Sequence, residues 1–567
     1  MRSTMDHFAP TWHRALLGAL TILMAATPAL ADSTPLFSTY LGGSRQDIGD
    51  AVAVQGGNTY VAGTTYSANY PVFMVSSSKP DEINNDAFVT ALSSSGTPIY
   101  SRYLPLGGGN EAVVGIGVTA DGSAYVAGEA FAGGESYIVV VKLEPWGAVA
   151  WRRETYGRLS AGGMTVDSQG NVYVTGRSTN PDENYDYRDY AYVWKLDASG
   201  ATSYWAEIDG NYSEHGEDVA VDASGNAYVT GITISDNLPR SIQPAAPGGY
   251  NAFVTKLDPA GAILWSTYLG GIGDEFGDQI EVAPDGSLVV AGTTNYSDFR
   301  TLNAIQAEHQ GEQDLFLVRL RPWGSLISST YLGGSSNDSV TALALDASSI
   351  LLAVSSSPED GFPLPEPLDP SCGGMFVAKL DATASRVLDA ACLGNSRIHG
   401  VAVDSSGVSL TGVTDDSLPL ANAWQPAYGG NGDAFAAKLT LNNTPDCSAA
   451  AASPATLSPA DGRFVNVSIR GVTDPDGDRV TITLTSIFQD EFLTSPGTPD
   501  AGGVGTPTAR LRASRIPGGD GRVYHLRYTA TDTQGGTCSG TVKVCVPLSG
   551  GGTCVDGGAR IDSTRAY

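Results

Sequence analysis

A four-part phrase of short β-patterned runs recurs along most of this chain and constrains its fold more than any other feature. One copy has its runs at 252–257, 263–269, 279–282 and 288–292. Gly, Asp, Pro and Ser turns separate the runs, and their alternation and content of Val, Tyr, Thr and Phe are typical of strands. Four strands that cannot bury their own faces must pack against further copies, and radial packing of such copies gives a β-propeller.

Two sequence anchors give the number of copies. The second run of each copy ends at one of seven positions: 62–63, 127–128, 175–176, 230–231, 291–292, 353–354 and 411–412. The third run ends at one of seven others: 91–92, 142–143, 195–196, 256–257, 319–320, 379–380 and 438–439. Most copies lie roughly 50 to 65 residues apart, which suits propeller blades. We therefore predict an all-β fold, with a seven-bladed β-propeller of four-stranded blades over residues 32–441.

The order of the runs predicts how the ring closes. Small apolar residues at 219–221 suit a crowded central channel, so this type of run is expected to be the innermost strand. The chain then begins with an unpaired outer run at 36–41 and ends with a blade, 401–439, that lacks one. The N-terminal strand should complete that last blade and remove an exposed sheet edge.

These phrases also resemble a known repeat. Ser-Thr-Tyr-Leu-Gly-Gly-Ser at 329–335, the Asp-Ala-Ser-Gly-Asn run within 220–231 and Asp-Ala-Phe-Val at 86–89 are similar to the SBBP-type bacterial seven-bladed propeller repeat. The resemblance covers residues 36–441. It implies an exported or surface protein and specifies no activity.

The first 31 residues have the pattern of a signal peptide. An apolar run at 15–26 follows His13 and Arg14, and Ala29-Leu-Ala31 fits a cleavage site. The run is too short to span a bilayer, and no later stretch approaches that length. We expect a secreted, periplasmic or cell-surface protein without a transmembrane segment.

Charge narrows the range of partners. The formal net charge is −28 and the pI is about 4.4. Nucleic acids and anionic membranes need basic surfaces, so both are excluded as partners. The ligand is expected to be a protein or a glycan, and the protein is expected to be a monomer.

The propeller phrase stops near 442–446, which we predict to be a linker. Apolar residues then alternate with polar ones at 465–469, 480–484 and 524–528, which predicts a β-sandwich over 447–548. The stretches 472–478 and 528–536 resemble bacterial cadherin-like or immunoglobulin-like modules. A Gly-rich tail, 549–567, is expected to be at best partly ordered.

Six cysteines in an exported chain indicate disulfides. Cys372 and Cys392 bracket a predicted hairpin on adjacent strands, so we expect them to pair. The remaining four cysteines allow three connectivities. In sandwiches of the type that the C-terminal module resembles, the first and last strands commonly lie side by side. On that ground we favour Cys447–Cys538 and Cys545–Cys554.

Acidic residues recur where the chain enters the innermost strands. Five of the seven copies have an acid at the same position, and three further acids follow it: Asp47, Glu111, Glu214, Glu275 and Asp338, then Asp50, Glu217 and Asp278. On one interpretation all eight rim a mouth of the channel and bind a cation or cationic ligand. On the other, which we favour, the acids accept hydrogen bonds from backbone amides of their own Gly-rich turns.

A second acidic motif lies in the C-terminal module. Asp474, Asp476 and Asp478 alternate along a tight loop, a spacing that can turn three carboxylates toward one Ca²⁺, with Asp532 as a fourth ligand. In the modules that this one resembles, such loops often bind Ca²⁺. A simple turn explains the same residues equally well.

No catalytic motif was found, whether a zinc-protease pair of histidines, a nucleophile elbow, a phosphate loop or a Cys-x-x-Cys. We therefore predict a non-catalytic, exported binding protein that acts outside the cell or at its surface. The alternatives are a carbohydrate-binding or hydrolytic propeller and an envelope structural protein.

Overall fold

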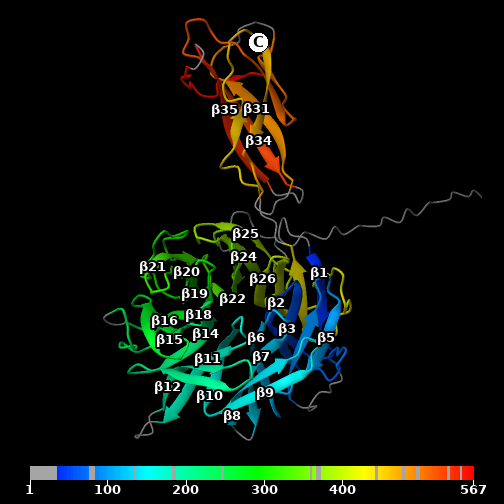
Figure 1. Cartoon of the computed structure of the whole chain (residues 1–567), viewed down its shortest axis with the longest axis vertical. Coiled ribbons are helices and arrows are strands. Elements are labelled where there is room, and N and C mark those ends of the chain that lie inside the picture. The colour runs from blue at the N-terminus through cyan, green and yellow to red at the C-terminus, as the bar shows by residue number, and fades with distance from the viewer. Residues whose placement is uncertain are drawn as a thin grey trace, which may run out of the picture.

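The computed structural model describes residues 35–566 except 76–83, 133–134, 182–186, 244–247, 358–360, 365–371, 441–444, 475–478, 493–497, 533–536 and 549–551. Every regular element in this part of the chain is a β-strand. Strands β1–β28 form a ring of sheets, and β29–β36 form a second body (Figure 1). No helix with the length and apolarity needed to cross a bilayer occurs in the described residues.

Strands β1–β28 build seven four-stranded antiparallel sheets. The first three are β2 (Asp47–Gln55), β3 (Asn58–Thr65), β4 (Asp86–Leu92) and β5 (Pro98–Tyr103); β6 (Glu111–Val118), β7 (Ala124–Ala132), β8 (Glu135–Leu143) and β9 (Val149–Tyr156); and β10 (Leu159–Val166), β11 (Val172–Pro181), β12 (Tyr187–Leu196) and β13 (Thr202–Ile208). The next two are β14 (Glu214–Val221), β15 (Ala227–Thr233), β16 (Asn251–Leu257) and β17 (Ile263–Leu269); and β18 (Glu275–Val282), β19 (Leu288–Thr294), β20 (Asp314–Leu320) and β21 (Leu326–Leu332). The last two are β22 (Ser339–Leu345), β23 (Ser349–Ser355), β24 (Met375–Asp381) and β25 (Val387–Ala391); and β26 (Arg397–Asp404), β27 (Gly407–Thr414), β28 (Asp433–Leu439) and β1 (Pro35–Leu41).

The strands that open the sheets touch one another in a closed circle. Each of β2, β6, β10, β14, β18, β22 and β26 contacts the next, and β26 contacts β2. A ring of sheets whose first strands surround one axis is a β-propeller, and those first strands are the inner strands. The runs predicted to be innermost are therefore the ones that line the channel.

The ring is closed by the start of the chain. Strand β1 pairs antiparallel with β28, with Tyr40 opposite Phe435 and Leu41 opposite Ala434. The sequence prediction that the N-terminal strand completes the last sheet is confirmed. This pairing joins residues almost 400 positions apart and leaves β28 with neighbours on both sides.

Local turn chemistry defines the inner hairpins. In the hairpin between β14 and β15, Asp222 Oδ1 accepts the amides of Ser224 and Asn226 at 2.9 and 3.0 Å. Gly225 has a φ of +80°, which favours glycine. The same acid-led turn recurs at Asp167, as expected for a repeat.

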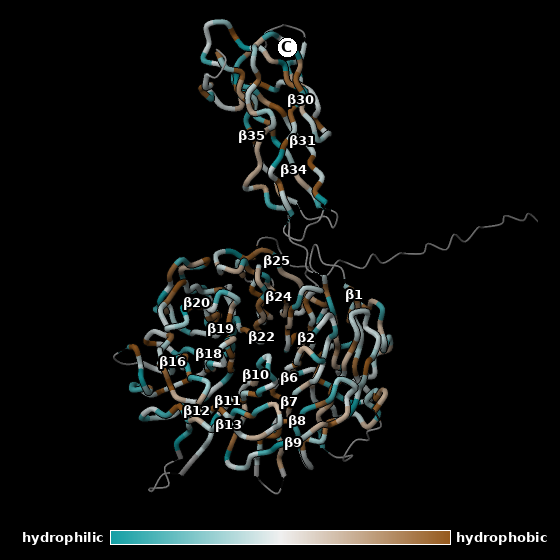
Figure 2. Tube along the Cα trace, viewed as in Figure 1, coloured by the Kyte–Doolittle hydropathy of each residue, from teal (hydrophilic) through white to brown (hydrophobic). Residues whose placement is uncertain are grey.

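The core of the ring lies between neighbouring sheets. One buried cluster combines Tyr60 and Val89 of the first sheet with Val113, Val126 and Val139 of the second. Figure 2 shows hydrophobic stretches along strands such as β22 and β24. Because each sheet buries both faces against its neighbours, the middle strands β4, β20 and β28 are buried along their whole length.

The C-terminal body has two further four-stranded sheets. They are β29 (Ala451–Ser453), β30 (Phe464–Arg470), β33 (Thr508–Arg512) and β32 (Ala501–Gly502); and β35 (Thr537–Val546), β34 (Arg522–Thr531), β31 (Thr481–Gln489) and β36 (Ile561–Asp562). One buried cluster takes residues from both sheets, among them Val467, Leu484 and Tyr524. The alternation predicted around 465–469, 480–484 and 524–528 therefore marks strands with one buried face.

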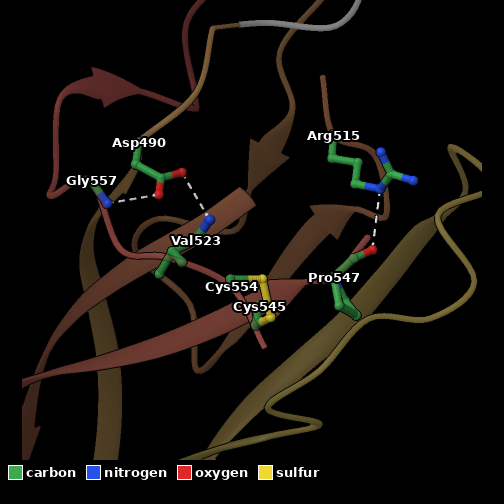
Figure 3. Close-up of a disulfide and its surroundings, with 7 residues drawn as sticks. All are labelled: Asp490, Arg515, Val523, Cys545, Pro547, Cys554 and Gly557. Carbon is green, nitrogen blue, oxygen red and sulfur yellow. Dashed lines mark hydrogen bonds between the residues drawn. A yellow bond between two sulfur atoms is a disulfide. The ribbon is translucent and has the colours of Figure 1, made fainter. Parts of the chain in front are cut away.

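The chain after residue 549 is more ordered than expected. Strand β36 pairs with β31, with Asp562 opposite Phe488. Cys545 and Cys554 form a disulfide beside this tail, and Asp490 accepts the amides of Val523 and Gly557 at 2.8 and 3.1 Å (Figure 3). The expectation of a partly ordered tail is wrong for 552–566, because these covalent and polar contacts hold it against the second sheet.

All six cysteines are paired, and the predicted pairs are confirmed. Cys372–Cys392 joins the approach to β24 to the end of β25, and Cys447–Cys538 joins the start of the C-terminal body to β35. Signal residues 1–31 lie outside the described residues. Of the predicted linker, residues 442–444 also lie outside them, and Asp446 already bridges to Thr473.

Candidate functional site

The acids that begin the inner strands are structural parts of their turns. Asp47, Glu111, Glu214, Glu275 and Asp338 are at most 1% exposed. Each accepts the amide of the glycine four residues earlier, and the donors are Gly43, Gly107, Gly210, Gly271 and Gly334, at distances of 2.5 to 3.0 Å. These contacts support the turn interpretation for all five, and the lining of the channel cavity described below does not include them.

The next strand of the same sheet adds a second donor to several of these carboxylates. Thr233 of β15 donates to Glu214 Oε1 at 3.0 Å, and Thr294 of β19 donates to Glu275 Oε1 at 3.0 Å. Side chains at the start of the strand are thus drawn into the turn by its amides and by a hydroxyl. They have no role in the lumen.

The other three predicted acids occupy a different kind of position. Each inner strand has a register shift against its partner, at which one residue is left out of the pairing. The residues skipped by the pairing are Asp50, Val114, Gly162, Glu217, Asp278, Thr341 and His399. A bulge re-aims the side chain of its extra residue. Asp50, Glu217 and Asp278 are therefore a separate set from the turn acids.

A cavity of about 300 Å³ lies where the inner strands meet, and all seven of them contribute to its wall. Its acidic lining residues are Asp50, Glu217, Asp218 and Glu281, and His399 lies on the same wall. No Lys or Arg lines it. We call Asp50, Glu217, Asp218, Asp278 and Glu281 the channel acids. Asp278 is included because it shares the bulge position and feels the charge of Glu217.

Two of the channel acids escaped sequence reasoning. Asp218 follows its bulge at a position that holds Ala51, Gly115, Gly163, Gln279, Ala342 or Gly400 in the other inner strands. Glu281 stands two residues beyond that position, where the others have Ala53, Gly117, Thr165, Ala220, Ala344 or Ala402. A carboxylate where a repeat otherwise keeps mostly small residues is the signal that could have found both.

Burial raises the pKa of every channel acid. The pKa of Asp50 rises to about 6, that of Asp218 to about 7 and that of Asp278 to about 7, in each case chiefly because the group is desolvated. The pKa of Glu281 rises to about 8, through desolvation first and the charge of Asp218 second. Its side chain is exposed to the lumen, and the seven inner strands surround that lumen. Close to neutral pH these groups are divided between acid and carboxylate.

Hydrogen bonding further separates the channel acids. Asp218 accepts the amides of Val219 and Ile280 at 2.8 and 2.9 Å, which ties β14 to β18. Thr64 donates to Asp50 at 2.7 Å. Burial also raises the pKa of Glu217, with the charges of His215 and Arg177 opposing the rise. Glu217, Asp278 and Glu281 are thus the channel acids whose ionised forms are least compensated.

The described residues contain no group of three or more His, Cys, Asp or Glu side chains placed to hold a metal ion. Four of the five channel acids lie on the neighbouring strands β14 and β18, and Asp50 lies on β2. The predicted Ca²⁺ ligands Asp476 and Asp478 lie outside the described residues. Asp474 and Asp532 lie within them, and Asp532 is 7% exposed. The Ca²⁺ site stays a prediction.

Comparison with known proteins supports the fold. The SBBP β-propeller repeat family model matches residues 155–182, which run from the end of β9 through β10 and β11. A search of curated proteins returns no significant match.

Three solved structures are similar to the chain at low identity. The β-propeller domain of Cps50 (Swd1) from Myceliophteria thermophila is 9% identical with a TM-score of 0.39, covering 70% of this chain and 98% of that one. A PL25 ulvan lyase is 9% identical with a TM-score of 0.39, covering 67% and 93%. A Bacteroides caccae protein of unknown function is 11% identical with a TM-score of 0.25, covering 43% and 89%. We draw no functional argument from these three.

Proposed function

We propose that this chain is an exported, non-catalytic, seven-bladed β-propeller that carries an immunoglobulin- or cadherin-like sandwich and binds a cationic group of its ligand in the channel. The observation that supports this most strongly is the channel wall. Four carboxylates line a cavity of about 300 Å³ that no Lys or Arg enters. The three disulfides suit an oxidising compartment outside the cytoplasm.

The electrostatics favour an organic cation as the bound group. Ionising a carboxyl in this lumen is costly, as the raised pKa values of Asp278 and Glu281 indicate. A positive group among the channel acids would offset that cost and favour their ionised forms. Because no group of three such side chains is placed to hold a metal ion in the described residues, an elongated amine or guanidinium group suits the channel acids better than a single metal ion does.

The test uses spermidine as the probe and measures its binding to the full chain by calorimetry at pH 8. The Glu217→Gln/Asp278→Asn variant should bind at least about tenfold more weakly, since two of the channel acids lose their charge. The Glu214→Gln variant is the matched control, because Glu214 lies on the same strand but faces the turn. Equal loss in both variants, or no binding by the unaltered protein, would refute the proposal.

A further inference from the structure

The junction between the sheet of β14–β17 and the sheet of β18–β21 contains a buried oxygen that lacks a donor. Asn251, the first residue of β16, has no exposed surface. Its Nδ2 donates to Gly248 O at 2.7 Å, but its Oδ1 has no hydrogen-bond partner among the described residues. A buried acceptor without a partner is unusual and needs an explanation.

The group that faces Asn251 Oδ1 is the carboxyl of Glu275, which is also fully buried. A methyl group on Gly270 would lie 2.7 Å from Asn251 Oδ1 and closer still to Glu275 Oε2, so the two oxygens flank the same point. Turning the amide around would place its oxygen against Gly248 O and exchange one clash of acceptors for another. A hydrogen on Glu275 would supply Asn251 Oδ1 with the donor that it lacks.

The same two positions differ from sheet to sheet around the ring, and Glu214 keeps its acid opposite Tyr190. The residue that corresponds to Asn251 and the acid position of the next sheet form the pairs Asp86–Glu111, Tyr137–Leu159, Tyr190–Glu214, Asn251–Glu275, Asp314–Asp338, Gly374–Ser396 and Asp433–Asp47. Where the first member is Gly374 or Tyr137, the acid is lost as well. In four pairs both members carry a side-chain carbonyl or carboxyl oxygen, and all eight of those residues are at most 1% exposed.

We propose that three of these junction pairs, Asp86–Glu111, Asn251–Glu275 and Asp433–Asp47, are proton-binding sites, each holding one hydrogen between its two side chains, with Glu275 donating to Asn251 Oδ1. Two carboxylates that share a buried site cannot both ionise cheaply, and a carboxyl that faces an amide oxygen must donate to it. A metal ion is the weaker candidate, because no metal-holding cluster occurs in the described residues.

The groups around each pair act in the same direction. Glu275 is faced by Asp274 of its own turn, by Asp298 beyond β19 and by the Tyr331 hydroxyl of β21. Burial first, and then Asp298 and Asp274, raise the pKa of Glu275 against the donors Gly271 and Thr294. Burial raises the pKa of Glu111 to about 7, with Asp86 adding to the rise, and that of Asp433 to about 6, with Asp47 adding to it.

The test follows the carboxyl of Glu275 in the full chain by infrared difference spectroscopy during a pH titration. The unaltered protein should show the band of a protonated carboxylic acid that Glu275→Gln removes. In Asn251→Ala the band should persist, but its midpoint should move down by about half a pH unit or more, because the neutral form loses its acceptor. The matched control is Glu214, whose carboxyl band Glu214→Gln identifies. Glu214 occupies the same turn position, but its counterpart is Tyr190. The titration of Glu214 should therefore not respond to Asn251→Ala.

A second readout distinguishes a proton from a metal ion. The melting temperature is compared with and without Na⁺ or Ca²⁺ after treatment with a chelator. Melting that does not respond to either ion supports the proton. A stabilisation by Na⁺ or Ca²⁺ that Glu275→Gln abolishes would overturn the proposal, as would a Glu275 midpoint that Asn251→Ala leaves unchanged.

Discussion

Glu214 and Glu217 lie three residues apart on β14, yet their side chains have opposite surroundings. The Glu214 carboxylate meets the Gly210 amide and the Thr233 hydroxyl at the turn. The Glu217 side chain lies at a bulge and lines the channel cavity. The same contrast holds for Asp47 against Asp50 on β2 and for Glu275 against Asp278 on β18.

The contrast shows that burial alone does not assign a role to a carboxylate. Turn acids are surrounded by donors, so removing one leaves buried N–H and O–H groups without an acceptor. Channel acids are surrounded by other acids and small residues, so ionising them costs free energy. The two kinds of carboxylate lie three residues apart, so the alternation of the strand places them on opposite faces, and the bulge leaves the second one outside the pairing.

The largest change in the free energy of unfolding is expected when Glu214 and Glu217 are replaced by alanine, one at a time. Glu214→Ala should lower the free energy of unfolding by about 2–3 kcal/mol, since two buried donors lose their acceptor. Glu217→Ala should change it by less than about 0.5 kcal/mol at pH 6, as a surface-like lumen position would. Urea denaturation measures both. Equal losses in the two variants would erase the distinction between turn acids and channel acids.

The pH dependence of stability sharpens the comparison. Asp218, Asp278 and Glu281 have folded-state pKa values of about 7, 7 and 8, above the values expected for an unfolded chain. The folded protein therefore holds protons that the unfolded chain releases. This contribution is fully present below about pH 4 and is lost as the pH rises through about 7 to 8.

We expect the free energy of unfolding to fall by roughly 2 kcal/mol between pH 5 and pH 8.5, a figure reduced from the full linkage because water enters the lumen. Denaturation at a series of pH values checks this. A variant with Glu217, Asp278 and Glu281 changed to their amides should show a distinctly flatter profile. If both proteins gave the same slope, the channel acids could not be its source.

A smaller effect is expected at Glu281 alone. Glu281→Gln should raise the free energy of unfolding at pH 8.5 by about 1 kcal/mol and leave it unchanged at pH 5, because at the lower pH the native group is already neutral. Gln279 lines the same cavity on the same strand, so Gln279→Glu offers the reverse change. A gain for Glu281→Gln at both pH values would indicate packing instead of charge.

Much of the fold could be predicted from the sequence because it depends on periodic signals. The repeated runs predicted the strands and their order from the channel outward. The unpaired run at 36–41 predicted the pairing of β1 with β28. The disulfide between Cys372 and Cys392 followed from a hairpin that places the two residues on adjacent strands.

The site could be predicted only in part, because its arrangement depends on bulges. Alternation along β18 separates Asp278 from Glu275, but it does not reveal the register shift between Gly277 and Gln279. Recurrence of an acid along the repeat could not predict Asp218 or Glu281, because each stands at a position where the other inner strands have no acid. The pairing of β36 with β31 was missed because two residues beside glycines carry no strand signal.

The central claim is that the channel acids take up a cation at the expense of protons. The most direct measurement is calorimetry of spermidine binding at pH 7 in several buffers with different enthalpies of ionisation. We predict that binding releases protons from carboxyls whose pKa values lie near 7 and 8, and that the release disappears in the Glu217→Gln/Asp278→Asn/Glu281→Gln variant but persists in Glu214→Gln. Binding with no proton release, or release that survives the loss of these three acids, would contradict the account.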